Sequence, residues 1–114
     1  MSDHTALDQD TLEMLKDVME DGFNDLIMTY LTDSEVRVAA LAEAIESRDS
    51  EAVRREAHSL KGSSGNIGAT GLAGLCLVVE HKGRDGDLSG LEENLSDIRA
   101  AFAIISDSLK ALLN

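Results

Sequence analysis

The sequence predicts an all-α protein, an antiparallel four-helix bundle with an additional short N-terminal helix. The chain of 114 residues contains no proline, and aromatic residues make up only 3% of it. Hydrophobic residues make up 43%, so the core must consist mainly of aliphatic side chains and methionine, which suits helices. Few segments show the alternation of β-branched residues that a sheet needs. The length supports one core, so we expect a single helical domain over residues 1–114.

The first two helices are predicted from a capping signal and a hydrophobic repeat. A short helix is expected to begin after Asp10, where Glu13 completes a capping box, and to end at "EDG" (20–22). A long helix should follow to about Ser47, because its hydrophobic residues recur at steps of three and four. These residues are Phe23, Leu26, Ile27, Tyr30, Leu31, Val38, Leu41 and Ile45.

The next two helices follow the turn "SRDS" (47–50), where Asp49 or Ser50 provides the N-cap. Spacing predicts that the third helix buries Val53, Ala57, Leu60, Ser64 and Ile67. "GATG" (68–71) should end it, with Thr70 as the cap of a fourth helix that runs to about Arg84. That helix should bury Leu72, Leu75, Cys76 and Val79.

The last helix has the clearest pattern, after a loop expected at "GRDGD" (83–87). Its hydrophobic residues alternate steps of three and four, which is typical of a bundle seam. They are Leu88, Leu91, Leu95, Ile98, Phe102, Ile105, Leu109 and Leu112.

The overall charge and the N-terminus limit the classes of function. A net charge of −12 argues against nucleic acid or an anionic membrane as partner. Cys76 is the single cysteine, so there is no internal disulfide and a reducing compartment is favoured. The polar N-terminus is unlike a secretory signal, and no apolar run approaches a membrane span. We therefore expect a cytoplasmic protein.

The stretch "EAHSLKGSSGNIGA" (56–69) combines reactive and helix-weakening residues. His58, Lys61, Gly62 and Gly65 share one helix face, away from the predicted buried stripe. Each interior glycine costs about 1 kcal/mol relative to alanine, which bare backbone beside an exposed His58 would explain. The alternative is that the two glycines permit close helix packing or mark fraying towards Gly68.

The charges are distributed unevenly around this histidine. Residues 54–84 hold five basic residues against two acidic ones, so their net charge is +3 and the rest of the chain carries −15. A region that holds phosphate or meets an acidic partner is expected to show such a bias. Ordinary solvated helix faces are the alternative.

The segment "AHSLKGSSGNIGATGLAGLCLVVE" (57–80) resembles the signature of histidine-containing phosphotransfer (HPt) domains. The resemblance rests on a histidine followed by lysine at +3 and glycine at +4, then "GA", then a leucine-rich helix. It implies that His58 is phosphorylated, that Lys61 neutralises the phosphoryl group and that Gly62 gives access. It also implies that Glu80 hydrogen-bonds the ring and that Arg84 joins the site. The chain departs from the pattern at Gly83, which is expected to fray the helix just before Arg84.

The resemblance implies a phosphorelay carrier of the stand-alone bacterial type. A free-standing module fits a chain of this length that starts at Met1, although a piece of a larger kinase would look similar. The partners would be receiver domains of a hybrid sensor kinase and of a response regulator, and the protein is expected to be a monomer. It should have no cofactor, with magnesium on the receiver only. No ATP-binding element is present, because "GSSGNIGATG" lacks the terminal Gly-Lys-Ser/Thr and follows no strand, so we expect no kinase activity.

Apolar residues for docking are expected on the first helix at Met14, Val18 and Met19, and on the fourth at Ala73 and Leu77. The alternative is that they pack against the bundle, which is the favoured interpretation for Met14 and Val18. Cys76 is expected to be a buried thiol. His81 could be a second phosphate site only if its helix rotated.

The sequence shares single features with three other classes of protein. An acyl carrier protein would match "DSL" (107–109), but Ser108 lies within the last helix, whereas attachment needs an exposed helix start. A metal-binding bundle lacks ligands, because the three histidines are scattered and no Glu-x-x-His pair occurs. A passive scaffold of the same fold, without phosphorylation, stays open.

Overall fold

The computed structural model describes residues 3–113, which form five helices and no strand. In chain order these are α1 (Gln9–Met19), α2 (Gly22–Glu46), α3 (Ser50–Asn66), α4 (Thr70–Asp85) and α5 (Leu91–Lys110). The prediction of an all-helical chain is confirmed. No helix in this described part is long and apolar enough to span a bilayer.

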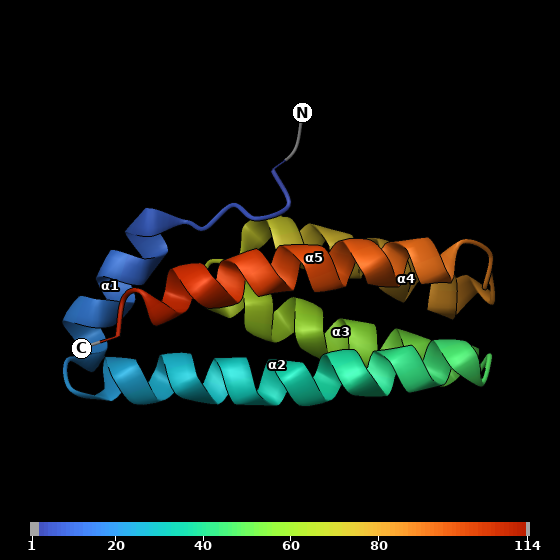
Figure 1. Ribbon diagram of the computed structural model, residues 1–114, viewed down its shortest axis with the longest axis horizontal. Helices are drawn as coiled ribbons and strands as arrows, with labels where there is room; N and C mark the ends of the chain where they lie inside the picture. Colours follow the sequence, from blue (N-terminus) through green and yellow to red (C-terminus); the bar gives the residue numbers. More distant parts are fainter. Residues whose placement is uncertain (1–2, 114) are drawn as a thin grey trace.

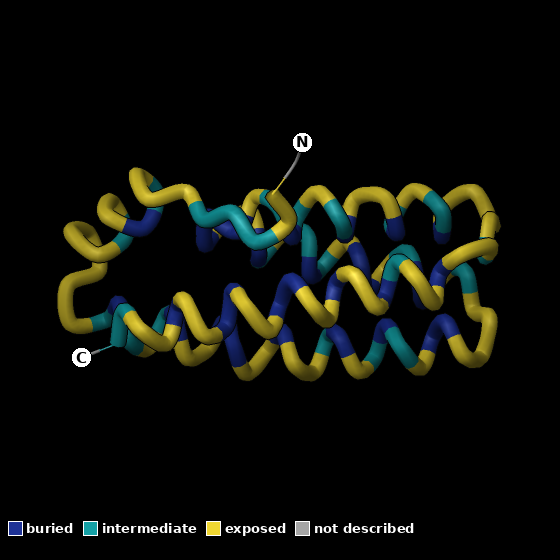
Figure 2. The backbone as a smooth tube through the Cα atoms, turned by 45° about the horizontal axis from the view of Figure 1, so that its top comes forward, coloured by how far each residue is buried: buried dark blue, intermediate teal, exposed yellow. Residues whose placement is uncertain are grey.

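The four longer helices lie side by side in an elongated body, and α1 lies at one end of it (Figure 1). Contacts join α2 to α3, α3 to α4, α4 to α5 and α5 back to α2, so the four helices close a ring. The short connections reverse the chain direction from each of these helices to the next (Figure 1). Each helix buries its inner side and exposes its outer side to solvent (Figure 2).

Aliphatic side chains fill the centre of the ring. The largest fully buried ones come from all four long helices: Ile27, Leu41, Val53, Leu60, Leu72, Val79, Leu91, Ile98, Ile105 and Leu109. Two of the three aromatic residues meet inside the bundle, where the rings of Tyr30 and Phe102 pack edge to face. A buried hydrogen bond of 2.8 Å joins the Tyr30 hydroxyl to the Ser64 hydroxyl and ties α2 to α3.

The predicted start of the first helix was wrong. The helix begins at Gln9 because the carboxylate of Asp8 accepts hydrogen bonds from the backbone amides of Asp10 and Thr11. Asp8 Oδ2 also accepts from the Thr11 hydroxyl at 2.9 Å. Asp8, and not Asp10, is therefore the N-cap, so the capping box with Glu13 does not form.

The cap of the third helix was predicted correctly, whereas that of the fourth was not. The Asp49 carboxylate accepts from the amide of Ala52, as expected of the N-cap of α3. Thr70 is instead the first residue of α4, after an N-cap at Ala69 that has no side-chain hydrogen bond. Gly68 has a φ of +89°, which turns the chain sharply between the two helices without a hydroxyl cap.

The predicted loop at 83–87 is also wrong for its first three residues. Helix α4 continues through Gly83 and Arg84 to Asp85, and Gly86 ends it in the left-handed conformation. Gly83 is buried, and a Cβ at this position would lie 2.6 Å from the backbone nitrogen of Arg54. The glycine therefore allows α3 and α4 to approach closely and does not fray the helix.

The last helix is shorter than the hydrophobic pattern suggested. It begins at Leu91, after Gly90 with a φ of +69°, and ends at Lys110, so Leu88 and Leu112 lie outside it and are half-buried. The ammonium group of Lys82 donates to the carbonyl oxygen of Ser89 and to Oδ1 of Asn94. This cation thus joins the end of α4 to the loop and to the first turn of α5.

Candidate functional site

Helix α3 presents His58 to solvent. All five residues of its predicted inner stripe are buried, as expected. His58 lies on another face of the helix, and its side chain is 61% exposed. Lys61 and Gly62 follow three and four residues later and share that face.

Helix α4 contributes Glu80, whose carboxylate joins two side chains of α3. One oxygen, Oε2, lies 3.1 Å from Nδ1 of His58. The other, Oε1, lies 2.7 Å from Nζ of Lys61. The side chain of Glu80 is only 16% exposed and that of Lys61 29%. The structure thus brings three of the predicted site residues together through one half-buried carboxylate.

The charge on Glu80 determines which ring nitrogen of His58 is free. Its contact with the Lys61 ammonium, and to a smaller extent that with His58, holds the pKa of Glu80 below its usual range, although partial burial opposes the shift. Glu80 is therefore ionised at neutral pH and can only accept a hydrogen bond. Nδ1 of His58 must then carry the proton, which leaves the lone pair of Nε2 unused in a solvent-exposed ring.

Gly62 and Gly65 border this histidine without a packing reason to be glycine. A Cβ added at either position would meet no other atom within 4 Å. The alternative that these glycines permit close helix packing is therefore wrong, and α3 continues to Asn66 without fraying. Their absent side chains leave open space on the face that carries His58.

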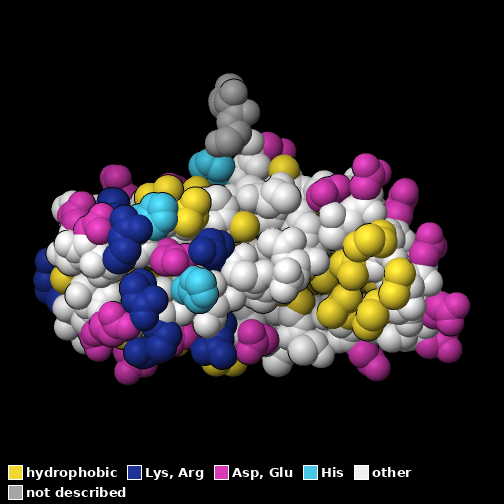
Figure 3. Space-filling view, turned by 180° about the vertical axis from the view of Figure 1, so that it is seen from behind, with side chains coloured by type: hydrophobic (Ala, Val, Ile, Leu, Met, Phe, Trp, Pro, Cys, Tyr) yellow, Lys and Arg dark blue, Asp and Glu magenta, His cyan; other side chains and the backbone are white. Residues whose placement is uncertain are grey.

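The other basic residues of the segment have different neighbours. Arg84 Nε lies 3.0 Å from Asp85 Oδ1, and in the described part of the chain Arg84 has no ion pair with Glu80. Arg54 pairs with Glu51 in the preceding turn. Lysine and arginine side chains nevertheless gather around histidine on one half of the face shown in Figure 3. Lys61 is the cation that contacts the Glu80 carboxylate.

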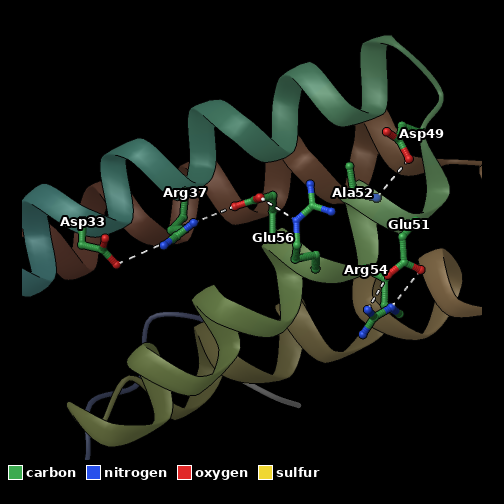
Figure 4. A network of polar contacts seen from close by, with 8 residues as sticks. Asp33, Arg37, Asp49, Glu51, Ala52, Arg54 and Glu56 are labelled. Carbon is green, nitrogen blue, oxygen red and sulfur yellow. Dashed lines mark hydrogen bonds and ion pairs between the residues drawn. The ribbon is translucent and has the colours of Figure 1, made fainter.

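A second charged network fixes α3 just before the histidine, and the sequence did not indicate it. Glu56 is 9% exposed, and its carboxylate lies 3.1 Å from Nη1 of Arg37 on α2 and 3.5 Å from Nε of Arg55. Arg37 also lies 3.8 Å from Asp33 on its own helix (Figure 4). The one available signal was an acidic residue adjoining a hydrophobic stripe, which is too common to be informative.

Apolar side chains are exposed on the same molecule, beyond the end of the basic region. Met14 and Val18 on α1 are 55% and 73% exposed, so the interpretation that they pack against the bundle is wrong. A groove of about 340 Å³ lies between α1, α2 and α3, with Leu15, Leu26 and Ile67 in its lining. Figure 3 shows a hydrophobic patch on the half of this face opposite to the basic side chains.

The remaining residues singled out in the sequence lie apart from these contacts. Cys76 is fully buried, as predicted, and burial raises the pKa of its thiol to about 12. His81 is exposed on α4. Ser108 lies in the last turns of α5 and not at a helix start. Among residues 3–113, no group of three His, Cys, Asp or Glu side chains is arranged to hold a metal ion.

Comparison with known proteins identifies the family. Residues 25–113 match the model of the Hpt domain, so the chain belongs to the Hpt domain family. The role that this family indicates for the domain is histidine phosphotransfer in a phosphorelay.

Two similar proteins agree with this family. The crystal structure of histidine-containing phosphotransfer protein B (HptB) from Pseudomonas aeruginosa PAO1 superimposes with a TM-score of 0.90 at 38% identity, covering 92% of this chain and 91% of that one. The multistep phosphorelay regulator 1 of Schizosaccharomyces pombe is 30% identical over 95% of this chain. This chain spans only 38% of the length of that relative.

Proposed function

We propose that His58 carries the phosphoryl group, accepting it from a receiver-domain aspartate and passing it to another receiver domain. The observation that carries this proposal is the hydrogen bond of 3.1 Å between Nδ1 of His58 and Glu80. It supports a free, exposed Nε2 as the nucleophile. His81 is also exposed, but no comparable contact supports it.

The chemical step is a displacement at phosphorus. Nε2 attacks the aspartyl phosphate, an N–P bond forms, the P–O bond to the aspartate breaks, and the aspartate leaves as a carboxylate with the electron pair. The Nδ1 proton stays on the ring, which becomes positively charged. Glu80 faces that charge, and Lys61 lies close enough on the same helix to offset the phosphoryl oxygens.

The remaining site residues act through access and charge. Gly62 leaves room for the incoming aspartyl phosphate, because a side chain there would project into the open space beside His58. Arg84, one turn after Glu80 on α4, adds positive potential near the phosphoryl group when its ion pair with Asp85 breaks. The protein needs no cofactor of its own in this scheme, and magnesium binds to the receiver domain.

The partners are receiver domains, one from a hybrid sensor kinase and one from a response regulator, and the protein acts as a cytoplasmic monomer. The groove between α1, α2 and α3 is lined by Ser63 of α3 and by Ile67 at the C-cap of this helix. Ser63 lies five residues after His58, or about 8 Å along the helix. A receiver that contacts both His58 and this groove would bury apolar area and reach the imidazole in one orientation. Met14 and Val18 on α1 are exposed as well and add apolar area for docking.

A transfer assay tests this function and separates it from a passive scaffold. A receiver domain labelled on its aspartate should transfer its phosphoryl group to the protein as an acid-labile, base-stable adduct. His58→Gln should abolish the adduct, whereas the matched variant His81→Gln should retain it. A label that persists in His58→Gln would place the site on another residue.

A further inference from the structure

Lys61 already has an anionic partner before any phosphoryl group arrives. Its Nζ lies 2.7 Å from Oε1 of Glu80, while the other oxygen of the same carboxylate bonds the His58 ring. Both partners are largely shielded from solvent, so the ion pair is screened less than a fully exposed one. The Glu80 carboxylate is thus shared between one cation and one N–H donor.

A phosphoryl group on Nε2 of His58 would compete for the same ammonium. It brings between one and two negative charges and three oxygen acceptors. Lys61 lies three residues after His58, on the same helix face. The neighbouring cations Arg54 and Arg84 have carboxylate partners of their own at Glu51 and Asp85. Lys61 is thus the cation that both contacts the Glu80 carboxylate and shares the helix face of His58.

We propose, building on the function proposed above, that Lys61 exchanges partners when His58 is phosphorylated. Its ammonium group leaves Oε1 of Glu80 and binds a phosphoryl oxygen, and Glu80 then interacts with the positively charged phosphoimidazole ring alone. The ion pair lost from the free protein opposes phosphorylation. Through this ion pair, Glu80 weakens the net stabilisation that Lys61 gives to phosphohistidine.

Replacing Glu80 by glutamine separates its two contacts. An amide oxygen still accepts the hydrogen bond from Nδ1–H, but a neutral amide does not hold the Lys61 ammonium. In Glu80→Gln, Lys61 is free before phosphorylation, so its binding to the phosphoryl group breaks no ion pair. Lys61→Met should therefore reduce phosphorylation more strongly in the Glu80→Gln background than in the wild-type background.

The experiment uses phosphoramidate as donor, so that it needs no receiver. The P–N bond of phosphoramidate breaks, ammonia leaves, and the N–P bond to His58 forms. At fixed phosphoramidate and ammonium concentrations, ³¹P NMR gives the ratio of phosphorylated to free protein for the wild type, the two single variants and the double variant. We expect Lys61→Met to lower the ratio of phosphorylated to free protein by a factor about two to five times larger in the Glu80→Gln background than in the wild-type background. This is the size typical of one ion pair. Lys110 is an exposed lysine at the end of α5. Lys110→Met is therefore the matched control and should show equal effects in both backgrounds.

Equal effects of Lys61→Met in the two backgrounds would overturn the exchange. NMR of the wild-type protein gives a second readout, independent of the variants: the Lys61 Nζ and Glu80 carboxyl signals should both shift on phosphorylation. Unchanged signals would also overturn it. Absence of phosphohistidine from every protein in the series would instead overturn the proposed function, so the two failures are distinguishable.

Discussion

Substitutions at Gly62 should separate stability from phosphotransfer. A Cβ at this position meets nothing within 4 Å, so Gly62→Ala removes the conformational entropy cost of glycine without creating a clash. We expect the free energy of unfolding to rise by about 1 kcal/mol, and the melting temperature by about 4 °C for a domain of this size. Urea and thermal unfolding followed by circular dichroism measure both quantities.

A larger side chain at the same position should keep the fold but obstruct the histidine. Leucine is a good helix former, so Gly62→Leu should remain folded while its side chain occupies the space beside His58. We expect transfer from a phosphorylated receiver to slow by about 10- to 100-fold, because small displacements of a reacting group have effects of this size. Phosphorylation by phosphoramidate, a much smaller donor, should slow less.

Gly74→Ala is the matched control, because Gly74 on α4 also faces open space. It should bring a similar gain in stability without any change in transfer rate. Transfer to the Gly62→Leu variant at the wild-type rate would refute the proposal that Gly62 gives the receiver access to His58. A loss of stability in Gly62→Ala would show that the fold itself requires this glycine.

Three further predictions concern the surroundings of the site. Gly83→Ala should lower the free energy of unfolding by about 1–3 kcal/mol, measured in urea, because its Cβ would lie 2.6 Å from the Arg54 nitrogen and helices α3 and α4 would have to separate. The pKa of Glu80 is lowered in the folded protein, so its contribution to stability is present above the unfolded pKa near 4.5 and is lost as the pH falls through the lower folded pKa. Glu80→Gln should therefore flatten the fall in the free energy of unfolding at acid pH. Parallel curves of stability against pH for the two proteins would contradict the pKa shift. Lys82→Met removes two hydrogen bonds to the α4–α5 corner and should cost about 1 kcal/mol, with faster amide hydrogen exchange in residues 86–90 and unchanged exchange in α2.

Hydrophobic periodicity predicted the helices well because burial determines them. All five residues predicted for the inner stripe of α3 are buried, although Ala52 and Glu56 of the same helix are buried as well and were missed. The long helices end within a few residues of their expected limits. The predictions failed where backbone geometry, or the choice between two nearby capping residues, determines the structure. Gly83 was interpreted as a helix breaker although it is a packing residue, and Asp8 was overlooked as a cap in favour of Asp10. Neither close helix approach nor the choice between adjacent caps is encoded in periodicity.

The site was predictable as a set of residues but not as a set of contacts. Resemblance to the HPt signature singled out His58, Lys61 and Glu80, which the structure brings together. It assigned Lys61 to the phosphoryl group and Glu80 to the ring, and so missed the direct ion pair between them. Spacing along one helix does not show which side chain of the next helix lies opposite. The pairing of Arg84 with Asp85 was missed for a similar reason, because the motif took no account of local partners.

The most direct test of the account is ¹⁵N NMR of the His58 ring before and after phosphorylation. The geometry predicts that the neutral ring of the free protein carries its proton on Nδ1, and that the phosphorus atom is bound to Nε2 in the phosphorylated protein. A free ring protonated on Nε2, or a phosphoryl group on Nδ1, would contradict the role assigned to the hydrogen bond with Glu80.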